Sequence, residues 1–501
     1  MKTGTRTFSF KSNLSGAFAL AGVPVIGTGL LYLVRSNDVS FLQLLLAFLL
    51  LLAPWRAYLE WRRGGREGLP MFAMLAFMYW LYYAVPLFLE EQVISNVYEP
   101  LGHQLPEASI TAAMFLALLG VGSLWLGMKS GIARFLVPRT HISLALTPGK
   151  LNYVRAVLVI GSFLSWYETP TALFGEGGRQ LVGILISVMP ILAFAILFRN
   201  FMKGDSEAVD RILIFGFLVL RLFSGLSGGW LGVAASILVI CGAIYLLERK
   251  RVPRAALVAV ALFTLFFQVG KEDFRRAYWQ RQGEVTTEAQ GQGGRLERVI
   301  FWTQTSLDKW GEALSDPSGE ALRTAMNRSV SRISLLTQTA NVIDQTPSVV
   351  PYQNGSLYSY MIYTWIPRFV WPDKPSVSEA NQFYQVAYGL STEDELSSVS
   401  IAVGFLTEGF INFGWVGVVG IMFLMGAFFD FYEKTFLAAK AGVLMTGIGL
   451  ILLPGFLSVE SQMAQYLGGL AQQVVVTILV MLPVVRIRRP AQLTRLVPVH
   501  E

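Results

Sequence analysis

A short segment late in the chain combines prolines, cations and aromatic rings at close spacing. Residues 360–376 read YMIYTWIPRFVWPDKPS, where three prolines flank Arg368 and Lys374. Proline fixes its own φ and restricts the residue before it, so both cations stand in stiff backbone. Such a loop can hold a guanidinium and an ammonium group toward an anion. The alternative is an aromatic, proline-rich plug packed on a membrane surface.

A second pair of cations precedes this segment. Between Ala321 and Asp344 apolar residues recur at helical spacing, which predicts one amphipathic helix. Arg328 and Arg332 would then lie one turn apart on its other face. Two guanidinium groups at this spacing can bind phosphate oxygens, although the same pattern is also typical of a solvated polar face.

Glu408 is a carboxylate inside an apolar run. It lies in GFLTEGFINFGWVG, residues 404–417, where we expect the chain to re-enter the membrane. An acidic side chain in such a place is costly unless it is paired, so a functional role is the first interpretation. A general base that deprotonates a hydroxyl would fit. The alternatives are a helix cap and a salt bridge, with Arg368 as a partner.

Arg221 is another cation in an apolar segment. The stretch Ile212–Ser224 is short for a membrane span, and the sequence SGLSGG follows at residues 224–229. We expect a hairpin that bends before it crosses, or a segment that lines a cavity. Arg221 would face that cavity, reach to the membrane surface, or pair with a nearby acid.

Membrane helices must position these residues. Of 501 residues, 53% are hydrophobic and 15% charged, and apolar runs of about 17 to 22 residues recur, each long enough to cross a bilayer. The fold class is therefore all-α and polytopic, because a transmembrane barrel needs short alternating strands. We expect about twelve spans, at residues 15–34, 40–54, 69–89, 108–128, 151–167, 181–198, 212–224, 230–247, 255–269, 415–431, 443–457 and 466–485.

Basic residues predict the orientation of these spans. Lys and Arg near span ends stay in the cytoplasm, and here they gather in alternate loops and in the C-terminal tail. Both termini are expected in the cytoplasm. The chain then divides into residues 1–270, with about nine spans, an external loop region at 271–397, and residues 398–501, with the re-entry segment and about three spans. The net charge of +7 follows from this topology, so we expect no nucleic acid partner.

Few other chemistries fit the sequence. Cys241 is the only cysteine, which excludes an intrachain disulfide and a cysteine metal site. His103, His141 and His500 do not share a metal-binding spacing. A phosphate loop of the G-x-x-x-x-G-K type is absent, so ATP-driven transport has no signature here. We therefore expect neither a metal nor another cofactor.

The composition of the expected external region changes at Leu296. Residues 271–296 are polar and poor in apolar groups, and we expect a flexible excursion there. From Leu296 onward apolar residues return at helical spacing, with Trp302 and Trp310 among them. Because tryptophan favours the bilayer surface, we expect a helix along the outer face of the membrane.

The order of these features resembles bacterial oligosaccharide repeat-unit polymerases, the O-antigen and exopolysaccharide polymerases. Many spans lead to one large late loop with NRSVSRISLL, then GSLYSYMIYTWIPRFVWPDKP, then GFLTEGFINFGWVG. The resemblance implies a metal-independent, membrane-embedded glycosyltransferase in the inner membrane. Its substrates would be polyprenyl-diphosphate-linked oligosaccharides. A membrane protein that regulates chain length, besides the membrane lipids, is an expected partner from the family alone.

The resemblance also implies roles for particular residues. Arg368, Arg328 and Arg332 become candidates for binding diphosphate or glycan, and Lys374 is a further one. Glu408 would be the base, or would orient Arg368. The candidates for stacking on sugar rings are Tyr360, Trp365 and Trp371, which could equally anchor the chain at the membrane surface.

One feature departs from the family pattern, and two other functions stay open. Members often have an arginine within the glycine-serine turn, whereas SGLSGGW has none and Arg221 lies a few residues earlier. A ligase that transfers a finished glycan to a lipid or protein would use much the same machinery. A flippase or other transporter of lipid-linked oligosaccharides would also have about twelve spans, but such carriers usually keep an internal repeat, which is not seen here.

Overall fold

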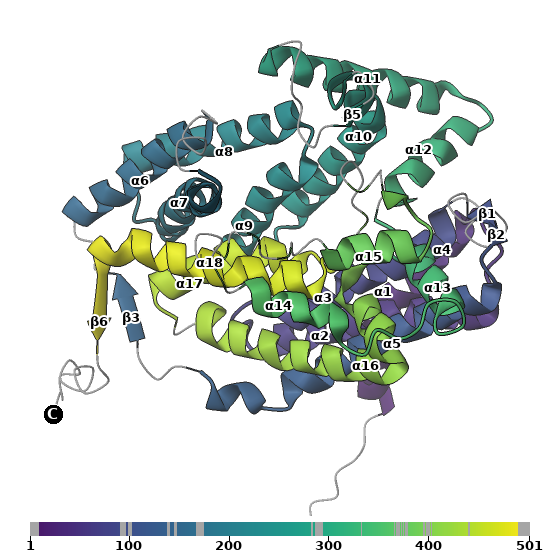
Figure 1. Cartoon of the computed structure of the whole chain (residues 1–501). Helices are drawn as coiled ribbons and strands as arrows, with labels where there is room; N and C mark the ends of the chain where they lie inside the picture. Colours follow the sequence, from purple (N-terminus) through teal and green to yellow (C-terminus); the bar gives the residue numbers. More distant parts are fainter. Residues whose placement is uncertain are drawn as a thin grey trace, which may run out of the picture.

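Most of the chain is helical in the computed structural model (Figure 1). The structure describes residues 10–90, 97–98, 103–137, 141–144, 148–166, 175–281, 284–285 and 294–488. The last range has gaps at 332, 365, 367–370, 372, 374, 376–378, 394–395, 397–400, 402 and 439–440.

The helices of the first half are α1 (Phe10–Leu33), α2 (Phe41–Arg63), α3 (Met71–Tyr83), α4 (Val85–Leu89), α5 (Glu107–Lys129), α6 (Pro148–Trp166), α7 (Gly175–Lys203), α8 (Ala208–Gly228), α9 (Leu231–Arg249) and α10 (Arg254–Tyr278). Those of the second half are α11 (Arg295–Ser315), α12 (Glu320–Ser331), α13 (Leu336–Gln345), α14 (Ser359–Thr364), α15 (Glu379–Ala387), α16 (Gly404–Tyr432), α17 (Val443–Leu457) and α18 (Met463–Met481). Short helices of other types lie at Ile132–Phe135, Ser356–Tyr358, Glu433–Leu437 and Leu482–Val484.

Strands are confined to three short antiparallel pairs in the described chain. They are β1 (Val97–Tyr98) with β2 (His103–Gln104), β3 (His141–Leu144) with β6 (Val485–Arg488), and β4 (Gln280–Arg281) with β5 (Glu284–Val285). The second pair joins the segment after α5 to the end of the described chain. The pairing brings residues 141–144 and 485–488 together, while the orientation of the spans stays a prediction.

Each of the expected spans overlaps a helix. In the described residues, eight helical segments are long and apolar enough to cross a membrane, which is the pattern of a multi-pass membrane protein. They are α2, α3 with α4, α5, α7, α9, α10, α16 and α18. The remaining expected spans correspond to α1, α6, α8 and α17, which do not meet these limits in the described residues, so a total of twelve stays a prediction.

The most extensive helix contact joins α5 to α16 through glycines. A Cβ atom at Gly127 would lie 2.0 Å from the Phe423 carbonyl oxygen, and one at Gly426 would lie 2.1 Å from the Leu124 carbonyl oxygen. The two backbones therefore approach closely only because these positions have no side chain. Small residues at helix interfaces serve the same purpose in membrane proteins generally.

The described part of residues 271–397 is more helical than its composition predicts, because α10 continues through Tyr278 into the stretch 271–296, where a flexible excursion was expected. Figure 1 shows α11 lying across the end of α10, with α12 leading away from it. Trp302 is fully buried, contrary to the expected place at the bilayer surface, because it packs on Phe267 and Phe274. Its indole N–H donates to the Phe267 carbonyl at 2.8 Å. The helix predicted from Leu296 onward is confirmed as α11, while Trp302 serves a local core.

The single helix expected over residues 321–344 is wrong. The chain forms α12 and α13, and residues 333–335 between them are not helical. The apolar stripe predicted continuity, but the backbone N–H of Leu335 donates instead to the Tyr82 carbonyl at the end of α3, at 3.0 Å. This tertiary hydrogen bond turns the chain, so α13 packs against α5 and α16.

Candidate functional site

Glu408 lies in the first turns of α16 and is fully buried. Its Oε2 accepts a hydrogen bond of 2.7 Å from the backbone N–H of Met463, the first residue of α18. Free N–H groups and the positive end of the helix dipole make a helix start favourable for a carboxylate. The helix-cap alternative is therefore what the structure shows. The second oxygen, Oε1, is buried and has no hydrogen bond among the described residues.

The glycine before this carboxylate brings α16 against the turn between α17 and α18. Gly404 has a φ of +75°, and its N–H donates to the Glu460 carbonyl at 2.8 Å. A Cβ atom there would lie 2.6 Å from the Val459 carbonyl oxygen. Only glycine adopts this backbone without strain and leaves this space. The GFLTEG sequence therefore positions Glu408 beside the start of α18.

A break in α16 receives the loop that follows α13. Phe413 and Gly414 have non-helical dihedral angles, with a φ of +62° at Gly414. The carbonyls freed by this break accept hydrogen bonds of 3.0 Å from the N–H groups of Gln353 and Asn354. The Asn412 side-chain oxygen accepts another, of 3.0 Å, from the N–H of Gly355. The GSLYSY segment is thus held on the GFLTEGFINF segment by backbone contacts.

Buried polar groups surround this junction. The hydroxyls of Thr339 and Thr407 are 2.8 Å apart, and the Tyr83 hydroxyl lies 3.0 Å from that of Thr339. These bonds tie α13, α16 and α3 together. The side chain of Gln462, at the start of α18, is buried, and neither of its polar atoms has a hydrogen bond among the described residues. Burial and the nearby Glu408 carboxylate raise the pKa of Tyr358, so this phenol stays neutral.

We name this region the motif junction: Tyr83, Thr339, Gly355, Tyr358, Thr407, Glu408, Asn412 and Gln462. It collects polar groups from segments that lie far apart in the sequence. Unpaired buried polar atoms are rare in proteins and mark places where a ligand, water or proton can bind. Sequence reasoning identified Glu408 here but missed Gln462 and Tyr358, because neither residue type stands out alone; their signal is tertiary.

Several predicted site residues lie outside the described residues. They are Arg332, Trp365, Arg368 and Lys374. The backbone of Arg328 is in α12, but its side chain also lies outside the described residues. Of the aromatic candidates, Tyr360 is in α14, and its ring meets that of Tyr363 with centroids 6.1 Å apart. Trp371 is 38% exposed and contacts Tyr363 at 5.6 Å. Tyr360 and Trp371 thus share one aromatic neighbour, and α14 packs on α18.

Arg221 belongs to another part of the molecule. It lies on α8, which packs mainly on α6, α7, α9 and α11. Its Nε is buried without a hydrogen bond among the described residues. The glycine-serine sequence is not a turn as expected, because α8 continues through Gly228 and the chain turns at Gly229, with a φ of +78°. The structure does not bring Arg221 to the motif junction.

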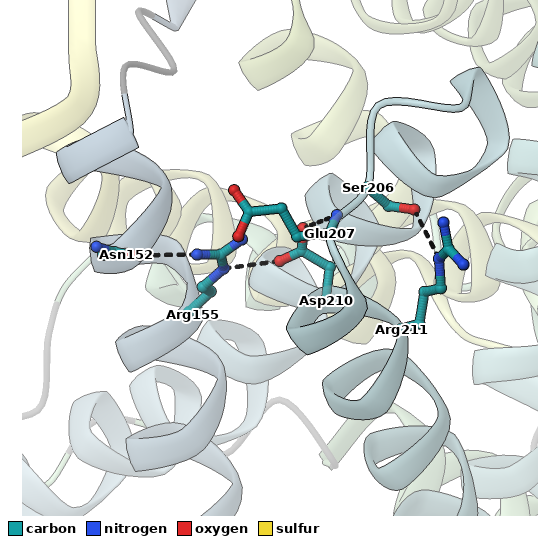
Figure 2. Close-up of polar contacts among 6 residues, drawn as sticks. All are labelled: Asn152, Arg155, Ser206, Glu207, Asp210 and Arg211. Carbon is teal, nitrogen blue, oxygen red and sulfur yellow. Dashed lines mark hydrogen bonds and ion pairs between the residues drawn. The ribbon is translucent and has the colours of Figure 1, made fainter.

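A second charged cluster was not foreseen from the sequence (Figure 2). Arg155 of α6 donates through Nε to Asp210 of α8 at 2.7 Å, and its Nη2 lies 2.8 Å from Glu207 Oε2. The Asp210 side chain is 2% exposed and also accepts a 2.9 Å bond from the N–H of Glu207, which caps α8. Because Arg155 is paired twice, we interpret the cluster as a structural link between α6 and α8.

The helices and the buried junction define a multi-pass helical membrane protein. A family model described as "Domain of unknown function (DUF8712)" matches residues 177–453, which is more than half of the chain. The chain belongs to this family. The matched region begins in α7 and ends in α17, so it includes Arg221, the helices α11 to α15 and Glu408. Neither a curated protein nor a solved structure matches the chain.

Proposed function

We propose that this protein is a polymerase that joins polyprenyl-diphosphate-linked oligosaccharide repeat units into surface polysaccharide. The observation that carries the proposal is the meeting of the sequence segments that resemble repeat-unit polymerases. Gly355, in the second segment, donates to the side chain of Asn412, in the third. Thr339, shortly after the first segment, contacts Thr407 in the third. Segments far apart in the sequence thus form one buried polar junction.

The proposed reaction breaks the bond between a sugar and the diphosphate carrier. A hydroxyl of the acceptor glycan attacks the anomeric carbon, the sugar–phosphate bond breaks, and the diphosphate leaves with the bonding electrons. The growing negative charge on the leaving group needs fixed donors nearby. Arg368 is the proposed donor because its guanidinium can bind two phosphate oxygens at once, with Arg328, Arg332 and Lys374 as further anion-binding groups.

Glu408 has two possible roles in this reaction. It could accept the proton from the attacking hydroxyl, or it could fix the active-site geometry by holding α18. Its complete burial and its bond to Met463 favour the second role. The aromatic rings of Tyr360 and Trp371, with Trp365, provide flat apolar faces for the sugars.

The proposal includes a location and an environment. The protein would lie in a bacterial inner membrane with about twelve spans and both termini in the cytoplasm. The region 271–397 would then face outward, where lipid-linked repeat units are joined. A membrane protein that sets chain length is the proposed partner. The reaction as proposed needs no metal or other cofactor.

Deletion of the gene followed by gel analysis of the surface glycan tests the function. Single repeat units in place of a long ladder, restored by the wild type but not by Arg368→Ala, would support a polymerase. Long chains that stay on their lipid carrier would instead indicate a ligase. Loss of even the single units from the outer surface would indicate a flippase. An unchanged ladder in the deletion strain would contradict the proposal.

A further inference from the structure

A cationic cavity lies at the far end of α2. It has a volume of about 250 Å³ and is formed by the end of α2, the chain after it, and the turn between α9 and α10. Its charged lining consists of five cations, Arg62, Arg66, Lys250, Arg251 and Arg254. None of the residues that line it is acidic. We call it the cationic cavity.

Two of these cations have a backbone conformation that is unusual for their type. Arg66 has a φ of +59° and Lys250 a φ of +55°, in the left-handed region that favours glycine. Each such residue costs about 1 kcal/mol or more. At Lys250, the C-cap of α9, glycine is the usual residue.

The two segments are joined to each other at this point. The Arg66 Nη1 donates to the Lys250 carbonyl at 2.7 Å, which fixes the α2 end against the α9–α10 turn. The Trp61 indole N–H donates to the Glu67 carbonyl at 3.1 Å, which holds the chain between these two residues. These hydrogen bonds hold the two backbone segments that carry the cations against each other.

Nearby carboxylates do not neutralise the cavity. Glu60 pairs with Arg56 at 3.1 Å, and Glu248 pairs with Arg199 at 2.5 Å. Glu67 lines a neighbouring cavity. Among the described residues, none of the five cations that line the cavity forms an ion pair. Five cations around one space repel each other, and an anion in that space would relieve the repulsion.

A simpler explanation accounts for part of the pattern. Cations collect in cytoplasmic loops and favour the negative end of helices, as at the ends of α2 and α9. Arg62, Arg251 and Arg254 are exposed, as that explanation predicts. It does not account for the half-buried Arg66 and Lys250, which both have left-handed backbone and are joined by a hydrogen bond. The aromatic rings of Tyr58 and Trp61, which line the same cavity, place it at the level of a membrane surface.

We propose that the cationic cavity binds a phosphate group, supplied by the headgroup of an anionic phospholipid or by free phosphate. Basic pockets between membrane helices commonly bind such headgroups. The cavity lies at the opposite end of α2 from the motif junction. Gln43, at the start of α2, donates to Thr111 in the first turns of α5, and Ser109 of α5 donates to Asp344 of α13, the helix that carries Thr339. From there α2 extends for about 34 Å. The site is therefore separate from any diphosphate bound at the motif junction.

Thermal unfolding of the full chain in neutral detergent tests this site. Added phosphatidylglycerol should raise the Tm of the wild type in a saturable way, while added phosphatidylcholine should not. The double variant Arg251→Gln/Arg254→Gln should need about tenfold more phosphatidylglycerol for half of the effect. The variant Arg134→Gln should respond like the wild type, because Arg134 is exposed and lies outside the cavity.

Inorganic phosphate distinguishes the source of the anion. Saturable stabilisation of the wild type by phosphate alone, lost in the double variant, would assign the cavity to free phosphate. Stabilisation only by the anionic lipid would assign it to a headgroup. No stabilisation by either anion, or an equal response in the double variant, would overturn the proposal.

Native mass spectrometry keeps the proposal testable if the double variant does not fold. The wild type should retain phosphatidylglycerol in preference to phosphatidylcholine, and excess inorganic phosphate should displace a bound headgroup. Equal retention of the two lipids would contradict the assignment. Neither measurement depends on glycan polymerisation, so failure of the polymerase proposal would leave this one unaffected.

Discussion

At the scale of single residues, Glu408 combines two properties that rarely occur together. One oxygen caps α18, and the other is buried without a hydrogen bond among the described residues. The sequence alone identified this carboxylate, because an acid in an apolar run stands out. It could not decide between a cap and a base, since Met463 is 55 residues away and that contact is tertiary.

Two substitutions separate these roles of Glu408. Glu408→Ala leaves the Met463 N–H without its acceptor and should destabilise the protein by about 1–3 kcal/mol. Glu408→Gln keeps an acceptor oxygen and should remain within about 1 kcal/mol of the wild type. The Tm in detergent measures both effects. Equal Tm values for the wild type and Glu408→Ala would contradict the capping role, and polymerisation by a folded Glu408→Gln would exclude a base.

Glu90, at the end of α4, should make stability depend on pH. Burial raises its pKa from the ordinary 4.5 to about 7, although the Ser334 hydroxyl bonds to it. The folded state therefore binds a proton more tightly than the unfolded state, and stability should fall as pH rises from about 4.5 to 7. The loss should be on the order of 2–3 kcal/mol.

Glu90→Gln removes this titration and should be more stable than the wild type at pH 8. Measurement of Tm from pH 5 to pH 8 checks this, with Glu320→Gln as a control at an exposed position. A Tm of the wild type that does not fall over this interval would show that Glu90 is not buried as described.

At the scale of elements, the contact between α5 and α16 should be the least tolerant of added volume. Gly127→Ala places a methyl group 2.0 Å from the Phe423 carbonyl oxygen, so the helices must separate. We expect a loss of about 1–3 kcal/mol or more. Gly122→Ala is the matched control, because it lies on the same helix with nothing within 4 Å of its Cβ. A lower Tm for the control than for Gly127→Ala would contradict this packing.

The link between α6 and α8 gives a second test at this scale. Arg155→Ala leaves Asp210, with its side chain 2% exposed, without its cation and should cost about 1–3 kcal/mol after allowance for solvent near the helix ends. Arg211→Ala, a nearby exposed arginine in Figure 2, should change stability by less than about 0.5 kcal/mol. Thermal unfolding measures the stability of both variants relative to the wild type. Similar losses of stability in the two would exclude a special role for Arg155.

Helix positions could be predicted from the sequence, whereas their packing could not. Apolar runs identified every span-like helix because run length alone decides what can cross a bilayer. The division of residues 321–344 was missed because it depends on Leu335 binding to Tyr82, and periodicity contains no such information. The Arg155 cluster was missed for a similar reason, since Asp210 is 55 residues away.

At the scale of the whole molecule, polar chemistry is separated between the two ends of the helices. The motif junction joins α13 and the loop after it to α16 and α18, and the cationic cavity lies beyond the other end of α2. We therefore propose two separate anion sites, one for the leaving diphosphate near the motif junction and one for a phosphate group in the cationic cavity.

Chain lengthening by the purified protein tests the central claim most directly. The substrate would be the lipid-linked repeat unit that accumulates in the deletion strain, and a gel would measure product length. We expect a ladder of products from the wild type. Arg368→Lys should lose most of this activity, because lysine keeps the charge but not the bidentate geometry. A folded wild type that makes no ladder, or an Arg368→Lys variant that makes the same ladder, would contradict the proposed polymerase mechanism.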